Sequence, residues 1–289
     1  MGSLIILYDN FSDHGLLTGG SWLAALPLTN LQDDDIQRVA RSNGATSAAT
    51  KFIVDLGLPQ TVDGIVLGPT NVTPGSTWRV RAYSDNTLTT LVYDSTIQTV
   101  DGDVINWANP PEWLEWEDPN FWYGIVGDID ELPQYLTHII PEATAPIAQY
   151  WLIEFFDEGN IDGAVDVGRL MIASAFRPSL NYTDNNGFGL RPLTDVQESL
   201  GGLRSYWDRG VRRSFRAQFQ YLAEAEVFGA AFRMMLRSGV SRQVFVVPNP
   251  DDANYGTRRS FLATFKTVPE IQQLLAARGA LAVDLEEVL

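Results

Sequence analysis

The chain has 289 residues, of which 45% are hydrophobic and 11% aromatic, and it carries a formal net charge of -16. This length favours two domains, and the hydrophobic content excludes an intrinsically disordered chain. Because the sequence contains no cysteine, disulfides, thiolate metal sites and cysteine nucleophiles are all excluded.

The charge is unevenly placed along the chain. Residues 1–180 hold 7 Lys and Arg against 24 Asp and Glu, a net of -17, whereas residues 181–289 hold 13 against 12, a net of +1. This change predicts two domains, 1–178 and 179–289, with a boundary near Pro178. The acidic first part argues against nucleic acid or an anionic membrane as a partner.

The N-terminal apolar run, Leu4 to Tyr8, is short and has no basic flank. It therefore predicts a first strand, and neither a signal peptide nor a membrane anchor. No stretch of the sequence approaches the roughly 20 apolar residues that a membrane-spanning helix needs. We expect a protein that does not insert into a membrane.

Short apolar runs, punctuated by Gly, Pro, Asn and Asp, follow as far as residue 178. This pattern is typical of an antiparallel β-sandwich and differs from alternating βαβ units. Within 77–83, Trp78, Val80 and Ala82 occupy alternate positions, which places them together on the core face. The predicted strands are 51–56, 63–67, 77–83, 91–95, 150–156 and 168–174.

An aromatic insertion, residues 104–149, is expected to interrupt the sandwich. A long loop inside a compact domain is usually functional or packed against another molecule. Since Trp and Tyr offer flat apolar faces with a polar edge, we expect the rings to contact another subunit or to stack on a carbohydrate. The candidate contact residues are Trp107, Trp113, Trp116, Trp122 and Tyr123.

The second part of the sequence predicts a small α+β domain. Residues 181–195 are rich in turn formers and predict a connector with little regular structure. A strand is predicted at 212–222, and further strands at 244–247, 260–266 and 281–288. The core face of the first of these strands is predicted to hold Phe215, Ala217, Phe219 and Tyr221.

One amphipathic helix is predicted between these strands, in residues 223–239, with Gly239 placed to end it. The apolar residues at helical spacing are Val227, Phe228, Ala231, Phe232, Met235 and Leu236. We find no internal repeat and no heptad series, so any oligomer must form through folded surfaces.

Enzymatic activity is not expected. His14 and His138 lie far apart in the sequence, and there is no Gly-x-Ser-x-Gly motif that would indicate a serine hydrolase. Four carboxylates among the tryptophans leave a glycosidase as an alternative, because two carboxyl groups across a sugar-binding groove suffice for hydrolysis. They are Glu112, Glu115, Glu117 and Asp118, and an acidic solvated loop explains them equally well.

A cation site at Asp33, Asp34 and Asp35 is a second alternative. Three consecutive carboxylates lack the spaced ligands of a calcium loop, so a solvated acidic turn is the preferred interpretation. We expect no bound metal and no cofactor.

The second part is rich in arginine. Strand alternation places Arg212 and Arg216 on the face opposite Phe215 and Phe219. Such a face is either solvated or paired with carboxylates of another subunit, and modest pairs accumulate when a ring repeats them. The candidate inter-subunit residues are Arg212, Arg216, Arg258 and Arg259.

Two stretches of the first part resemble a galactose-binding-like, or discoidin-type, β-sandwich. The first is residues 26–67, with LPLTNLQ, then KFIVDLG and then VDGIVL. The second is YWLIEFFDEGNIDGAVDVGRLMIA, residues 150–173. Some domains of this type bind sugars. The resemblance therefore keeps open an alternative function, that of a lectin-like carbohydrate-binding adhesion protein.

Combined with this sandwich and its tryptophan-rich insertion, three further stretches make residues 20–289 similar to distal tail, or tail-tip, proteins of tailed bacteriophages. They are SLGGLRSYWDRG, VFVVPNPDD and RRSFLATFK, at residues 199–210, 244–252 and 258–266. The resemblance implies a non-catalytic virion protein, made in the host cytoplasm, whose second domain forms a ring, expected to be a hexamer. The implied partners are copies of the chain, the tail tube protein, the baseplate hub, tail fibre proteins and a cell-surface glycan.

Overall fold

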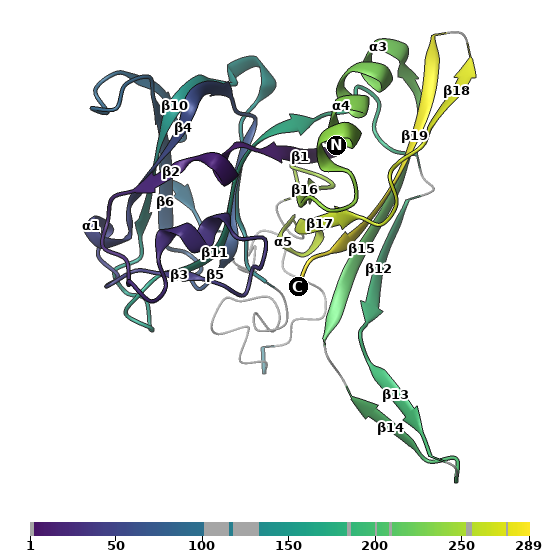
Figure 1. Ribbon diagram of the computed structural model, residues 1–289, viewed down its shortest axis with the longest axis horizontal. Coiled ribbons are helices and arrows are strands. Elements are labelled where there is room, and N and C mark those ends of the chain that lie inside the picture. Colours follow the sequence, from purple (N-terminus) through teal and green to yellow (C-terminus); the bar gives the residue numbers. More distant parts are fainter. Residues whose placement is uncertain are drawn as a thin grey trace. The chain divides into compact units, whose positions relative to one another are not determined.

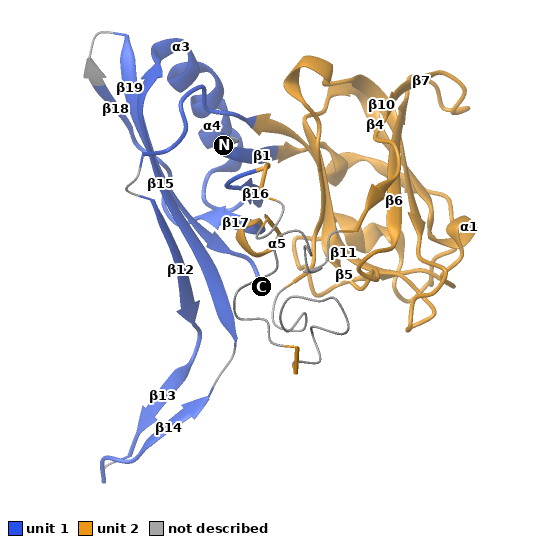
Figure 2. Ribbon diagram, turned by 180° about the vertical axis from the view of Figure 1, so that it is seen from behind, with its two compact units in different colours: residues 1–8, 176–249, 261–289 blue, residues 9–175, 250–260 orange. Residues whose placement is uncertain are grey.

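The computed structural model describes residues 3–100, 116–117, 133–183, 186–199, 201–207, 210–252, 256–275 and 277–289. The chain folds into two compact units (Figure 2). One, called here the sandwich unit, consists of residues 9–175 and 250–260. The other, called here the arm unit, consists of residues 1–8, 176–249 and 261–289.

These units differ from the two continuous ranges expected from the sequence, because the first eight residues fold with the C-terminal part. Strand β1 (Ile5–Asn10) pairs antiparallel with β16 (Val244–Val247), and Ile5 lies opposite Val247 in this pairing. The apolar N-terminal run therefore forms a strand, as predicted, but its partner strand is more than 200 residues away in the sequence.

The sandwich unit consists of two antiparallel layers. In the first, the strand order is β2-β4-β10-β6-β7, with β8 beside β6. In the second, β5 lies between β9 and β11, and β3 pairs with β11. Their bounds are β2 (Leu16–Thr18), β3 (Ala40–Arg41), β4 (Phe52–Thr61), β5 (Gly64–Thr70), β6 (Thr77–Tyr83), β7 (Leu91–Asp94), β8 (Gln98–Thr99), β9 (Leu136–Ile139), β10 (Ile147–Phe156) and β11 (Asp166–Phe176).

Five short helical turns accompany these strands in the described part of the sandwich unit. They are η1 (Phe11–His14), η2 (Leu28–Gln32), α1 (Ser47–Thr50), η4 (Glu142–Thr144) and α5 (Gly256–Arg259).

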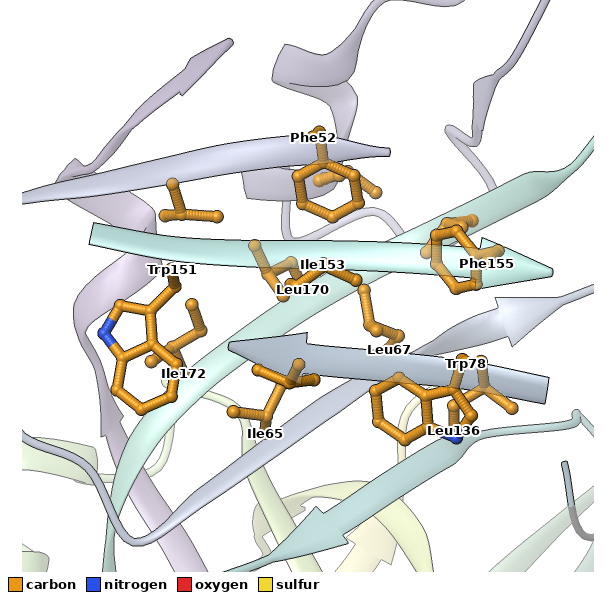
Figure 3. Close-up of a cluster of buried hydrophobic side chains, with 14 of the residues drawn as sticks. Phe52, Ile65, Leu67, Trp78, Leu136, Trp151, Ile153, Phe155, Leu170 and Ile172 are labelled. Atoms are coloured by element: carbon orange, nitrogen blue, oxygen red, sulfur yellow. The ribbon is translucent and has the colours of Figure 1, made fainter. Parts of the chain in front are cut away.

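The core of the sandwich unit lies between the two layers (Figure 3). Phe52, Trp151 and Phe155 project from the first layer, and Ile65 and Leu170 project from the second. Trp78, Val80 and Ala82 are buried, which confirms the face predicted from their alternation. Side chains from two facing sheets fill the space between them, as in other β-sandwiches.

The arm unit contains a mainly antiparallel sheet with the strand order β12-β15-β19-β17-β16-β1, and β18 pairs with β19 beyond this path. Residues 224–238 form a helical segment beside the sheet (Figure 1). The remaining bounds are β12 (Gly187–Pro192), β13 (Asp195–Glu198), β14 (Arg204–Trp207), β15 (Val211–Ala223), α3 (Glu224–Glu226), the π-helical turn η5 (Val227–Ala231), α4 (Phe232–Ser238), β17 (Phe261–Phe265), β18 (Ile271–Leu275) and β19 (Arg278–Glu287).

The structure corrects two expectations in this unit. The stretch 181–195, predicted as a connector, contains β12 and the start of β13, because β15 supplies a partner strand that local sequence does not reveal. Tyr221, predicted in the core, is exposed: it has a φ of 62°, and the β15–β19 register shifts between Phe219 and Leu222. Leu222 is buried instead, because the irregularity brings its side chain to the core face.

Among the described residues, no helix combines the length and the apolar character needed to cross a membrane.

Candidate assembly surface

Strands β13 and β14 form a hairpin that extends away from the rest of the arm unit (Figure 1). Every residue of both strands is exposed, and no third strand pairs with them in the part of the chain that the structure describes. An isolated two-stranded hairpin is marginally stable in water, because neither face is buried. The hairpin therefore has the properties of an element that is covered by a partner.

Both faces of this hairpin carry large apolar side chains. Leu203, Ser205 and Trp207 alternate onto one face, where Leu203 is 74% and Trp207 61% exposed. Val196 and Tyr206 lie directly opposite each other and share the other face. Exposed strands of monomeric proteins usually carry charged residues that discourage association. The large apolar side chains on both faces of this hairpin depart from that pattern.

The ion pair between Arg204 and Glu198, across the hairpin, contributes little to its stability. Arg204 Nε lies 3.2 Å from Glu198 Oε2, and both side chains are more than half exposed. Exposed pairs of this kind are worth about 0–1 kcal/mol. Apolar contact with a partner is the larger source of stabilisation available to the hairpin.

A second apolar surface lies on the helical segment. Phe228, Phe232 and Leu236 recur every four residues and are 53%, 49% and 75% exposed. The neighbouring side of the helical segment buries Val227 and Ala231 in the core of the arm unit.

The structure thus divides the apolar residues predicted at helical spacing into two groups. The core face consists of Val227, Ala231 and Met235, together with Met234. The other three, Phe228, Phe232 and Leu236, form a stripe that the described residues leave exposed. A helix needs only one apolar face to pack on a single sheet, so the second stripe has no function within this packing. Large exposed apolar patches on soluble proteins usually mark interaction sites.

The arginines predicted at subunit contacts are distributed over both units. Arg212 and Arg191 both approach Glu286 of the same chain, at 3.8 Å and 3.4 Å, and Arg216 is exposed on the face of β15 opposite the core. Arg258 and Arg259 were expected in the second domain, but they lie in α5, within the sandwich unit. Arg259 Nη1 contacts Asp252 Oδ2 at 2.8 Å.

Arg213, in contrast, is buried on the core side of β15, where it pairs with Glu287 of β19. Its Nε donates to Glu287 Oε1 at 2.9 Å, and its guanidinium lies over the Phe261 ring, 5.0 Å from the centroid. This buried pair was not among the interactions predicted from the sequence. The signal was present in the alternation, which places residue 213 on the same face as Phe215 and Ala217.

Of the five aromatic residues predicted to form a contact in the insertion, Trp116 is described, and it is 65% exposed. Trp107, Trp113, Trp122 and Tyr123 lie outside the described residues, as do the glycosidase candidates Glu112, Glu115 and Asp118. Glu117 is exposed.

The consecutive carboxylates Asp33, Asp34 and Asp35 are engaged by arginines. Arg38 contacts Asp33 at 3.1 Å and Asp35 at 3.5 Å. Arg169, a buried residue of β11, contacts Asp34 at 3.0 Å. The cations beside these three carboxylates are therefore the guanidinium groups of Arg38 and Arg169. Among the described residues, no group of side chains has the composition of a metal site.

Arg169 also contacts Asp13 Oδ1 at 2.8 Å. Burial raises the pKa of the Asp13 carboxyl above its ordinary value, and the neighbouring Arg169 opposes this shift. The guanidinium therefore joins η1 and the acidic turn to β11 within the sandwich unit.

The two histidines are separate, as expected from the sequence. His14 is exposed at the end of η1, and His138 is partly buried in β9. The Tyr93 hydroxyl and His138 Nε2 are 2.7 Å apart, and burial lowers the pKa of His138 below its ordinary value of 6.5. This pair joins β7 of one layer to β9 of the other.

Solved structures similar to this chain include carbohydrate-binding domains. CBM32 of AlyQ, in complex with 4,5-unsaturated mannuronic acid, is 16% identical with a TM-score of 0.35, over 57% of this chain and 96% of that one. The family 32 CBM of C. perfringens NanJ, in complex with galactose, is 17% identical with a TM-score of 0.37, over 58% of this chain and 99% of that one.

The lectin domain of lectinolysin, complexed with Lewis B antigen, is 13% identical with a TM-score of 0.35, over 57% of this chain and 95% of that one. At these identities the likeness concerns the fold alone. The sequence matches no protein-family model and no curated protein.

Proposed function

We propose that the protein is a non-catalytic structural subunit that assembles with copies of itself through the arm unit and carries the sandwich unit on the assembly. The observation that supports this function best is the exposed β13–β14 hairpin, which presents apolar side chains on both faces. A hairpin of two strands gains stability when a partner covers it.

The finer proposal is a distal tail or tail-tip protein of a tailed bacteriophage, in which the copies close into a hexameric ring. Its support is the resemblance found in the sequence, and the stretch 199–210 of that resemblance includes the residues of β14. The partners in this proposal are the tail tube protein, the baseplate hub and tail fibre proteins. The protein would reside in the virion.

The test is the mass of the purified full chain in solution, measured by light scattering from micromolar to high micromolar concentration and followed by negative-stain imaging. A closed ring, or a monomer that joins rings when tail tube protein is added, agrees with the proposal. A chain that stays monomeric in both conditions contradicts it.

Glycan binding by the sandwich unit is a second candidate function. Trp116 favours it, because an indole that is 65% exposed offers a stacking face for a sugar ring. The similar structures with bound galactose or Lewis B antigen make these two ligands the first to try. The measurement is a glycan array followed by calorimetry, with Trp116→Ala compared against Tyr206→Ala, which removes an exposed ring of the arm unit.

A further inference from the structure

We propose that the hairpin of one copy packs along the helical stripe of the next copy. The hairpin row is Leu203, Ser205 and Trp207, and the stripe is Phe228, Phe232 and Leu236. This inference rests on the proposed self-assembly and names the two surfaces that meet.

The two rows have matching lengths. Leu203 and Trp207 are four residues apart on the hairpin, which corresponds to about 13 Å at the rise of a β-strand. Phe228 and Leu236 are eight residues apart on the helical segment, which corresponds to about 12 Å at the rise of an α-helix. Anchors at both ends of the hairpin row can therefore contact both ends of the stripe.

The side-chain sizes along the rows are also complementary. The hairpin row alternates large, small and large, with Ser205 between Leu203 and Trp207. The stripe carries a ring at its centre, Phe232, that is about half exposed. The gap above Ser205 can accept this ring, as ridges on one element fill grooves on another.

Charges of opposite sign lie beside the C-terminal half of the stripe and beside the hairpin row. Arg233 and Arg237 follow Phe232 and Leu236 on the exposed side of the helical segment. On the hairpin, Asp195 pairs with Trp207 across the strands and so lies on the same face as the apolar row. An interface between these surfaces places a carboxylate near arginines, which favours the correct orientation.

The positions of the rows within the arm unit favour contact between copies. Figure 1 shows the helical segment near one end of the unit and the β13–β14 hairpin at the opposite end, and Figure 2 agrees. Two different surfaces at opposite ends make a heterologous, head-to-tail contact, which closes into a ring when the rotation between copies allows it.

The apolar area available is sufficient for a small specific interface. Trp207, Phe228 and Phe232 each expose about half or more of their surface, and Leu203 and Leu236 about three quarters. At about 150–250 Å² for a large aromatic side chain, the five residues together expose on the order of 500 Å². A specific interface of about 1,200 Å² in total, more than half of it apolar, needs roughly this much.

The absence of native cysteine makes directed cross-linking the decisive experiment. Full-length Ser205→Cys and Phe232→Cys chains are mixed and oxidised with oxidised glutathione. These two positions lie at the centres of their rows, so they meet whichever way the rows run. We expect a disulfide-linked dimer in the mixture, at least five-fold more than in either variant alone.

Arg204→Cys mixed with Phe232→Cys is the matched control, because Arg204 neighbours Ser205 but lies on the other hairpin face. Equal cross-linking by the control, or efficient cross-linking of Ser205→Cys with itself, overturns the inference. If the unmodified chain assembles by light scattering but the Ser205→Cys and Phe232→Cys mixture does not cross-link, this interface is wrong and the proposed self-assembly stands. If the chain assembles neither alone nor with added tail tube protein, and does not cross-link, both are wrong.

A complementation experiment tests the head-to-tail arrangement separately. Trp207→Asp places a carboxylate at the hairpin anchor and Phe232→Asp places one at the centre of the stripe, so the apolar contact carries an unpaired charge and each variant alone is expected to be monomeric. A 1:1 mixture restores one intact contact and is expected to stop at a dimer in analytical ultracentrifugation. Assembly of either variant to the size of the unmodified protein contradicts the proposed contact.

Discussion

Replacing Arg213 by Met tests how strongly a single buried ion pair holds the arm unit together. Arg213 and Glu287 have side chains that are 1% and 0% exposed, and the pair joins the start of β15 to the end of β19. Glu287 also accepts a hydrogen bond from the Arg213 backbone N–H, at 2.8 Å. The Arg213→Met variant fills similar volume but leaves the Glu287 carboxylate buried without its cation.

Removing one partner of a buried pair costs about 3–5 kcal/mol, because the remaining charge stays desolvated. With a urea m-value of about 2–3 kcal/mol per molar, the unfolding midpoint of the arm unit should fall by about 1–2.5 M. The double variant Arg213→Met with Glu287→Leu should recover most of this loss. It should not recover all of it, because the backbone N–H loses its acceptor, at about 1 kcal/mol.

Urea denaturation followed by circular dichroism measures the midpoint, and hydrogen exchange of the β15 and β19 amides assigns the change to the arm unit, since two units can unfold separately. Arg216→Met, on the exposed face of the same strand, is the control and should stay within about 0.5 kcal/mol of the unmodified protein. If Arg213→Met behaves like this control, the reasoning about the buried pair is refuted.

Three further predictions concern the sandwich unit. Arg169→Met should lower its free energy of unfolding by about 1–3 kcal/mol in thermal denaturation, because Asp13 then keeps a largely desolvated carboxyl without its cation. The lowered pKa of His138 means that the unfolded state binds a proton first as pH falls below about 6.5, so stability should decrease from pH 7 to pH 5. His138→Phe should reduce this slope in paired urea titrations, and an unchanged slope would contradict the assignment. Gly20→Ala should destabilise the unit by about 2 kcal/mol or more, because Gly20 has a φ of 66° and a Cβ there collides with the Lys51 carbonyl oxygen. Gly159→Ala, whose Cβ meets nothing within 4 Å, is the matched control by calorimetry.

The local pattern of the sequence was sufficient for most of the strands and for the helix. Alternation in 77–83 correctly assigned Trp78 and Val80 to the core, and the change of period after residue 223 correctly located the helical segment. These inferences succeed because a strand repeats every two residues and a helix every 3.6, whatever lies elsewhere in the chain.

The sequence was less informative about the candidate surface. It led us to expect assembly through arginines and the aromatic insertion, and these contacts remain predictions. It gave no indication of the β13–β14 hairpin, the start of which it predicted as part of a connector. The apolar positions of the helix were identified correctly, yet their spacing could not tell which half packs on the sheet. Phe232 and Ala231 are neighbours in the same pattern, but only Ala231 is buried.

What the sequence determined by itself is the set of elements, the mainly antiparallel β class and the uneven charge of the two parts, because each depends on nearby residues or on composition. What only the tertiary structure decided is which elements have partners. The pairing of β1 with β16, the recruitment of residues 187–192 by β15 and the burial of Arg213 against Glu287 all join residues far apart in the chain. Such pairings depend on the balance between chain entropy and the packing of many distant residues, and periodicity within one segment does not contain that information.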